Sequence, residues 1–202
     1  MKTKSNFFVI VSIITLLLAA SCGKKPSKPV ALNQLDENGM RQGEWHIKYP
    51  DGKLREIIFF KDDKQSGAQK RFFENGQLNI EMYWACDSLS SWLDSVNRMY
   101  GDDGTLLLES FYKDGIPDSL FRIFYNNGIL KQTERYRQGQ KVGLWQYFRE
   151  DGTLEKTIDY TGFEQNWSEE NQSGIITWYD ETGKAVKSEI WTQGSQIEIK
   201  NF

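Results

Sequence analysis

The chain has 202 residues, of which 39% are hydrophobic and 14% aromatic, and its formal net charge is −3. The aromatic content excludes a disordered chain, and the length suits one domain without requiring two. A mildly acidic balance argues against nucleic acid as a partner.

The N-terminal segment has the composition of an export signal. Lys2 and Lys4 precede a mostly apolar run from Phe7 to Ala20. A helix over this run would rise only about 21 Å, which is short of the roughly 30 Å hydrocarbon core of a bilayer. We therefore expect residues 1–21 to be a cleaved signal peptide rather than a permanent transmembrane helix.

The end of this segment, Leu18-Ala19-Ala20-Ser21-Cys22, resembles a lipobox. The resemblance assigns lipid attachment, including palmitate, to Cys22, although the Leu usually found three positions earlier is Ala19 here. The alternative is a secretory signal that happens to end in Cys. Several acyl chains on one Cys satisfy the requirement of more than one chain for stable anchoring.

Residues 22–34 are rich in Lys, Pro and Ser and show no periodicity, so we expect a lipidated tether. Lys24, Lys25 and Lys28 either lie against anionic headgroups or are simply solvated. The residues behind Cys22 contain no acidic sorting signal. By resemblance to such signals, this favours the cell envelope, on the periplasmic face of an outer membrane.

From residue 35 onward the chain is built from internal repeats. A glycine recurs every 24 to 31 residues, and we number units 1 to 6 and positions within each unit from it. Position −9 is Gly or Ser in all six units, position −4 is aromatic in five, and position +2 is Leu in five. Position +8 is always aromatic. The glycines are Gly52, Gly76, Gly104, Gly128, Gly152 and Gly183.

The residue before the glycine is Asp or Asn in units 1 to 5, and this pair predicts a hairpin turn. Each unit is therefore expected to be a β-hairpin, with a second turn at Gly115, Gly139 or Gly194. Isolated hairpins are marginal in water, so the units should pair edge to edge into one sheet. Positions −7 and −4 have opposite parity, which requires a bulge or a sheet with two partly apolar faces.

The segments Gly43-Glu-Trp45-His-Ile-Lys-Tyr-Pro-Asp-Gly52-Lys-Leu54 and Gly143 to Leu154 resemble the MORN repeat variant, as found in the YwqK-type antitoxin family. The resemblance covers about residues 36–196 and implies an all-β repeat domain over 35–202. That domain would be an elongated single-layer antiparallel sheet of about six hairpins of about 24 residues. The antitoxin label implies a toxin partner, but a cytosolic antitoxin has no use for a lipidated signal.

The sequence offers no evident catalytic chemistry. His46 is the only histidine, so neither a histidine metal cluster nor a histidine-based triad is available. Most Asp residues lie in the predicted turns, where turn formation already explains them. We expect no catalytic residue, metal or cofactor, although paired carboxylates leave a hydrolase open.

Two intervals are longer than the others, and such departures from a repeat are places where specificity can lie. The first contains Trp92 and the second contains Trp167, Glu169 and Glu170. A Trp beside acidic residues is a candidate anchor for a protein partner. The alternative is a tolerated insertion whose Trp folds back onto the sheet.

Together these features predict a non-enzymatic lipoprotein, anchored to the membrane through Cys22, that uses its hairpin repeats to bind a protein in the cell envelope. The alternatives are binding of a glycan or cell-wall polymer through exposed aromatic residues, and antitoxin-like binding of a toxin.

Overall fold

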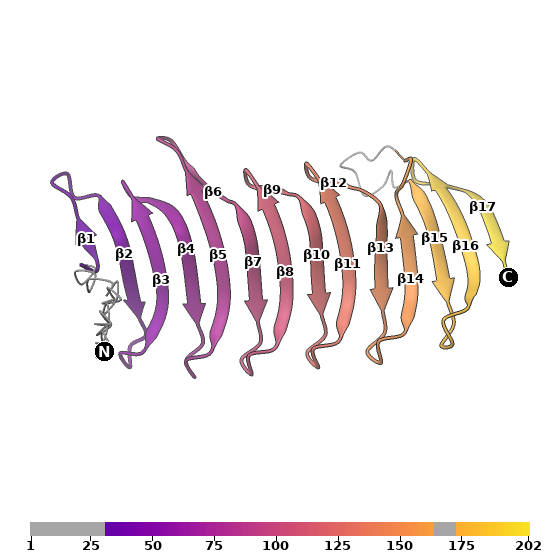
Figure 1. Cartoon of the computed structure of the whole chain (residues 1–202), viewed down its shortest axis with the longest axis horizontal. Coiled ribbons are helices and arrows are strands. Elements are labelled where there is room, and N and C mark those ends of the chain that lie inside the picture. The colour runs from indigo at the N-terminus through magenta and orange to yellow at the C-terminus, as the bar shows by residue number, and fades with distance from the viewer. Residues whose placement is uncertain (1–30, 164–172) are drawn as a thin grey trace, which may run out of the picture. The chain divides into compact units, whose positions relative to one another are not determined.

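The computed structural model describes residues 31–163 and 173–202, and these form one antiparallel sheet of 17 strands (Figure 1). No helix occurs within these ranges, so the predicted all-β hairpin architecture is confirmed. The first nine strands are β1 (Gln34–Leu35), β2 (Arg41–Lys48), β3 (Leu54–Lys61), β4 (Lys64–Phe72), β5 (Leu78–Cys86), β6 (Ser91–Leu93), β7 (Ser95–Tyr100), β8 (Leu106–Lys113) and β9 (Ile116–Pro117). The others are β10 (Ser119–Phe124), β11 (Leu130–Arg137), β12 (Gln140–Lys141), β13 (Leu144–Phe148), β14 (Leu154–Asp159), β15 (Gly174–Tyr179), β16 (Ala185–Thr192) and β17 (Ser195–Asn201).

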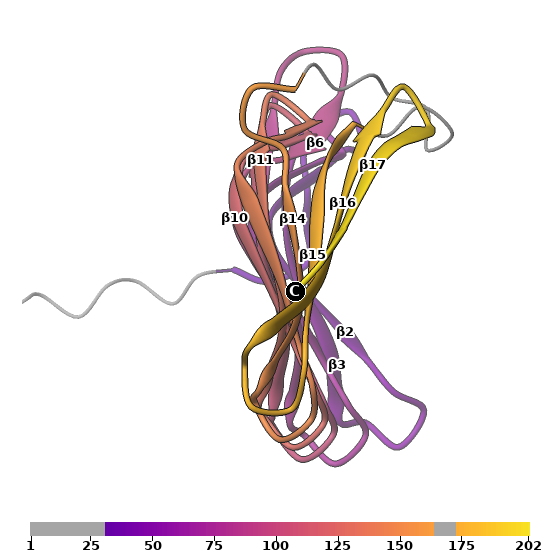
Figure 2. The same cartoon turned by 90° about the vertical axis from the view of Figure 1, so that its right-hand side faces the viewer.

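The long strands pair in chain order, each with the one before and the one after it. The short strands β6, β9 and β12 pair antiparallel with the upper ends of β5, β8 and β11. Among the described residues no second layer lies over the sheet, which is strongly twisted when viewed along its length (Figure 2). A single layer follows from the repeat, because each hairpin finds its partners beside it rather than above it.

The predicted turns occur at all six repeat glycines, along the lower edge of the sheet in Figure 1. In unit 1, the Gly52 N–H donates to the Tyr49 carbonyl and the Tyr49 N–H donates to the Lys53 carbonyl. Only Gly52 in this loop has positive φ, at 88°, so the turn is a three-residue loop that ends in a left-handed glycine.

The side chain of the residue before the glycine also accepts a backbone hydrogen bond within these turns. The side-chain oxygen of Asp51 accepts the N–H of Lys53 at 3.0 Å, and Asn75 and Asp151 make the same bond in their units. Unit 6 has Thr at this position, and there Asp180 accepts the backbone N–H groups instead. The Thr153 and Thr182 hydroxyls also donate to Asp151 and Asp180. These hydroxyl bonds and the backbone N–H bonds lower the pKa of the turn aspartates, because an accepted hydrogen bond favours the ionised carboxylate.

The tight two-residue turns lie at the opposite, upper edge of the sheet. Both central residues have positive φ in Asp114-Gly115, at 52° and 77°, and in Gln138-Gly139, at 50° and 77°. This geometry defines a type I′ turn, whose twist suits the strands it joins.

A β-bulge in every unit resolves the parity conflict seen in the sequence. The pairing register shifts between positions −5 and −4 in all six hairpins, and position +3 has no cross-strand partner. In unit 1, Ile47 pairs with Glu56 but Lys48 pairs with Leu54. The bulge therefore places the Leu at +2 on the face of the aromatic at −4, and the aromatic at +8 on the face of position −7.

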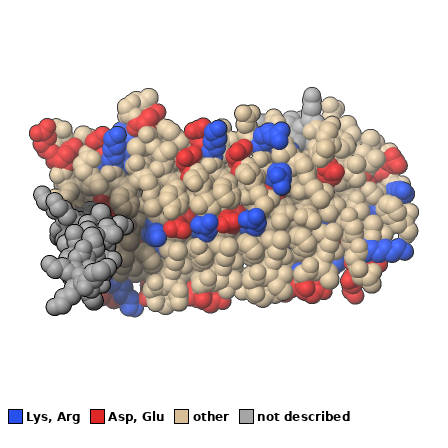
Figure 3. Space-filling model, viewed as in Figure 1, with Lys and Arg blue, Asp and Glu red and all other residues tan. Residues whose placement is uncertain are grey.

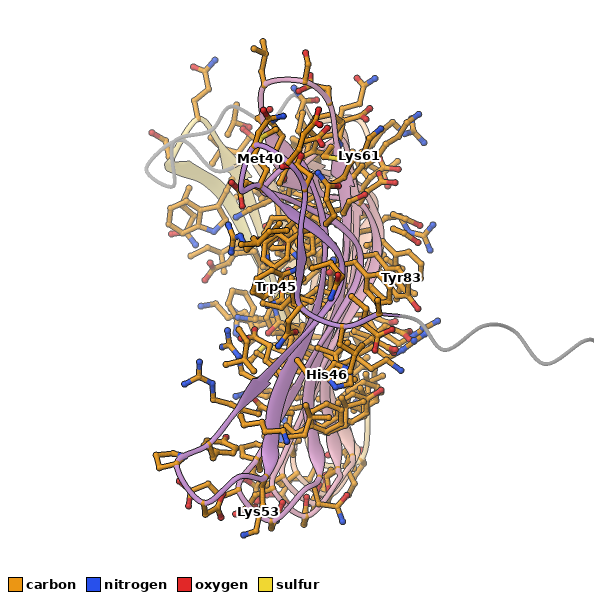
Figure 4. The ribbon with its side chains drawn as sticks, turned by 90° about the vertical axis from the view of Figure 1, so that its left-hand side faces the viewer. Met40, Trp45, His46, Lys53, Lys61 and Tyr83 are labelled. Carbon is orange, nitrogen blue, oxygen red and sulfur yellow. The ribbon has the colours of Figure 1, made fainter. Side chains whose placement is uncertain are left out.

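The sheet consequently has two different faces, and Figure 4 shows Trp45 on one side and Tyr83 on the other. We call the side of positions −7, +6 and +8 the core face, and the side of positions −8, −6, −4, +2, +5 and +7 the open face. All six buried apolar residues lie on the core face. They are Ile58, Phe60, Phe121, Trp145, Ile158 and Tyr160.

The two edge regions of the sheet differ in how far other residues pair with them. At the N-terminal edge, β1 pairs with the start of β2, and the Asn33 side chain bonds both the N–H and the carbonyl of His46. The first sheet residue, Gln34, is the last residue of the expected tether. At the other edge, every residue of β17 is exposed.

Candidate interaction surface

A row of alternating charges crosses the middle of the open face from β4 to β10. It runs Lys70, Glu81, Arg98, Glu109 and Arg122, with successive N to O distances of 3.2, 3.6, 2.9 and 2.6 Å. Figure 3 shows this row at mid-height of the sheet. Its members occupy positions −6 and +5, which pair directly across each hairpin. The row is a single ion-pair network across five strands rather than a set of isolated surface pairs.

The two glutamates in this row are each held between two cations. Their side chains are 15% and 14% exposed, whereas the flanking Lys70 and Arg122 side chains are 42% and 43% exposed. The hydrogen bond to Glu109 raises the pKa of the Arg98 guanidinium. The row therefore buries its anions and presents its cations, so its two ends offer positive charge to a ligand.

The same row continues without charge through β11 to β16. Positions −6 and +5 there are Thr133, Gln146, Thr157, Thr177 and Ser188. Thr133 donates to Gln146 across β11 and β13, at 3.5 Å, and Thr177 donates to Ser188 at 3.4 Å. Positions −6 and +5 thus carry a charged ladder from β4 to β10 and a hydroxyl and amide ladder from β11 to β16.

Apolar stripes flank this row on both sides. The lower stripe consists of positions −4 and +2, which are Phe72, Leu78, Tyr100, Leu106, Phe124, Leu130, Phe148, Leu154 and Tyr179 in units 2 to 6, with Ala185 ending it. These residues are half-buried. The upper stripe, at positions −8 and +7, contains Val96, Phe111 and Leu144, of which Leu144 is 47% exposed. In units 4 and 5 it is interrupted by the charged residues Arg135 and Asp159. An apolar, polar, apolar order on a uniform sheet is a surface suited to a protein partner.

The core face carries a continuous run of aromatic rings from β8 to β14. Centroid distances between successive rings are 5.5, 4.9, 5.2 and 5.2 Å along Tyr112, Phe121, Tyr136, Trp145 and Tyr160. These are the tilted and edge-on contacts that aromatic pairs prefer. Burial raises the pKa of Tyr136 and Tyr160. The run is the main hydrophobic core of the described residues, so it supports the sheet rather than offering a binding site.

In units 2 and 3 the core face is polar at position −7, where units 1, 4 and 5 have rings. The Gln69 side chain accepts from the indole N–H of Trp84 at 2.8 Å and donates to Glu56 at 2.5 Å. Arg71 also donates to Glu56, at 3.2 Å. Asn97 lies nearby on this face, buried, and its side-chain N–H group has no partner among the described residues. This part of the core is a hydrogen-bonded network.

Trp92 is the one predicted partner-binding residue that the structure describes. It lies on β6 opposite Ala85, half-buried, and a Cβ at position 115 would come within 3.2 Å of its own Cβ. Trp92 therefore packs against the turn of the next hairpin. Its indole N–H is buried without an acceptor in the described part of the chain. Its role in partner binding stays a prediction.

The other predicted site residues lie outside the described residues. These are the lipid-attachment residue Cys22 and the partner-binding candidates Trp167, Glu169 and Glu170. His46 lies on the open face, with its Nε2 2.6 Å from Glu44 Oε1. Over residues 31–163 and 173–202, no group of His, Cys, Asp and Glu is placed to hold a metal ion. The same ranges contain no helix long and apolar enough to cross a membrane.

The charged row is the feature that sequence reasoning missed. Position −6 is Lys70, Arg98 and Arg122 in three successive units, and position +5 is Glu81 and Glu109 in two. Opposite charges at these two positions signal cross-strand pairs once the bulge is known, because the bulge sets which residues face each other.

Comparison with known families agrees with this geometry. Residues 41–62 and 65–85 match the model of the MORN repeat variant. They correspond to strands β2 to β5, the hairpins of units 1 and 2, which confirms the predicted resemblance to the MORN repeat variant. The likeness to the YwqK-type family stays a prediction. No curated protein matches the chain.

Proposed function

We propose that this chain is a lipoprotein, anchored through Cys22 to an envelope membrane, that binds a protein partner on the open face of its sheet. MORN repeats are in general modules for contacts with proteins or membranes. The observation that carries the proposal is the open face itself. Its flanking stripes are apolar and no layer of the described residues covers them.

The arrangement of the open face favours a protein over a small molecule. Small-molecule sites are concave and enclose most of their ligand. The open face instead repeats the same rows across six hairpins, with half-buried aromatic residues beside a charged row. Large, open surfaces with aromatic residues and Arg are typical of protein interfaces.

A photoreactive residue placed on each face of the sheet tests the binding proposal. Leu144 lies on the open face and is 47% exposed, and Met99 lies on the core face and is 39% exposed. We expect a probe at 144 to crosslink a partner in native membranes, and a probe at 99 to crosslink none. Equal crosslinking at both positions, or none at 144, would contradict the proposal.

The anchor is tested separately by metabolic labelling with a clickable fatty acid. The full chain should be labelled and should sediment with membranes, while Cys22→Ser should be unlabelled. A labelled Cys22→Ser variant would assign the lipid to another residue. Because the crosslinking result depends on the sheet and labelling on Cys22, either half of the proposal can fail alone.

A further inference from the structure

Strand β17 uses only one of its two edges in the described residues. It pairs with β16 from Ser195 to Asn201, and no other described strand lies against its outer edge (Figure 1). A strand edge of this length is a template for pairing with another chain. At the opposite end of the sheet, Asn33 and β1 already occupy part of the edge of β2.

The backbone groups that point outward from β17 follow from its pairing with β16. The Phe202 N–H donates to the Val186 carbonyl at 3.1 Å. Inward and outward bonding alternate along an antiparallel strand. The pairing register shifts at Ile197, so the alternation is counted only from Glu198 onward. Over this stretch Glu198, Lys200 and Phe202 bond to β16, and Ile199 and Asn201 direct their N–H and carbonyl groups outward.

We propose that the partner on this edge is a second copy of the chain, paired antiparallel through β17 about a twofold axis at Ile199. Ile199 would then exchange both backbone hydrogen bonds with its own copy. The two sheets would join into one with their open faces on the same side, since directly opposed residues in an antiparallel pair share a face.

The charges of β17 are self-complementary in this register. Glu198 lies opposite Lys200 of the copy, and Lys200 lies opposite Glu198 of the copy. Both residues belong to the open face, because they pair with Ile190 and Ser188. The same chemistry already occurs within the sheet, where the directly opposed Lys70 and Glu81 form an ion pair at 3.2 Å.

Neighbouring registers lack this complementarity. Outward bonding by Ile199 and Asn201 restricts register shifts to steps of two. A shift in one direction places Glu198 opposite its own copy, and a shift in the other places Lys200 opposite its own copy. Like charges directly opposed across a strand pair are destabilising. Pairing about Ile199 is therefore favoured over both, and its hydrophobic centre removes an isoleucine that is 53% exposed from water.

Sedimentation equilibrium of the detergent-solubilised full chain, at several concentrations and in excess micelles, tests the dimer. We expect the wild type to dimerise reversibly. Glu198→Lys places two like-charged Lys pairs at the interface, and Lys200→Glu places two Glu pairs. Each variant should weaken dimerisation at least about tenfold, the size expected for opposed like charges. Circular dichroism of each variant controls for folding.

Charge restoration separates this proposal from a general loss of edge pairing. The double variant E198K/K200E, and an equimolar mixture of the two single variants, both restore unlike pairs. Each should dimerise within about threefold of the wild type. A monomeric wild type, single variants that dimerise normally, or a double variant as weak as the single variants would overturn the proposal. Crosslinking at the open face is unaffected by any of these outcomes, so the two proposals fail independently.

Discussion

Two neighbouring stretches of the sheet share one backbone and differ in what they place on it. From β4 to β10, the open face has a charged row, and the core face has buried Gln69, Asn97 and Ser110 as far as β8, where the aromatic run begins. From β11 to β16, the open-face row is uncharged, and the core face is dominated by aromatic rings through β14. The position of the bulge and the pairing register within each hairpin are the same in both stretches.

The comparison shows which positions the repeat fixes and which it leaves free. Glycine at 0 and the bulge at +3 are fixed because turn geometry and register depend on them. Positions −7, −6 and +5 are free, because a paired strand accepts any side chain that is satisfied there. The side chains at these free positions therefore form rows that run along the sheet. Such a row cannot be recognised from a single hairpin.

The largest effect is expected where the aromatic run is interrupted. Trp145 is 3% exposed and contacts the rings on both sides. Trp145→Ala should lower the free energy of unfolding by about 3–5 kcal/mol, the usual cost of removing a large buried aromatic. Urea denaturation measures this change in the free energy of unfolding. Hydrogen exchange should show that the loss of protection is centred on β11 to β14. A cost below about 1 kcal/mol would mean that the run is not the core.

Making the polar network around Gln69 more apolar should not stabilise the fold. Gln69→Leu makes position −7 apolar but leaves the Trp84 N–H unbonded and removes a donor to Glu56. We expect a loss of about 2 kcal/mol, because buried polar groups without partners are costly. The double variant Gln69→Leu with Glu56→Leu should recover about 1 kcal/mol of this loss. If Gln69→Leu stabilises the fold, the network is not a core element.

The charged row should respond to salt, and the uncharged row should not. Glu109→Gln removes the carboxylate between Arg98 and Arg122, and we expect a loss of about 1 kcal/mol at low salt that shrinks in 1 M NaCl. The matched variant in the uncharged row is Thr177→Val, which removes the bond to Ser188. Its smaller cost should not change with salt. Equal salt dependence in the two variants would remove the distinction between the rows.

The sequence predicted the hairpins and their order in the sheet, but little of the surface that the sheet presents. The turn glycines and aromatic columns gave the hairpins and their edge-to-edge order, since these depend on local backbone geometry. The parity conflict between −7 and −4 required a bulge, but its place at +3 depends on pairing that only the structure shows. The charged row was missed for this reason: Arg98 and Glu109 are 11 residues apart and become partners only through the register. Sequence reasoning instead emphasised the insertion at Trp92, which packs against the turn at Gly115.

The smallest effect is expected in the turns, which both stretches share. Asp151→Asn keeps an oxygen to accept the Thr153 N–H, as Asn75 and Asn127 do in their units. The bonds from Thr153 lower the pKa of Asp151 in the folded state. Its contribution is therefore present above the unfolded pKa, near 4, and is lost as the pH falls through the folded pKa. The variant should match the wild type at pH 7 and lose less stability than the wild type between pH 5 and about pH 2.

The reverse change provides the control. Asn127→Asp places a carboxylate at the same position of unit 4, where the Ile129 N–H would be its donor. It should leave stability at pH 7 unchanged and steepen the acid loss, as judged by urea midpoints across the pH series. If Asp151→Asn lowers stability at pH 7, the turn needs the charge rather than the acceptor. The alternation of Asp and Asn between units would then be part of what distinguishes them.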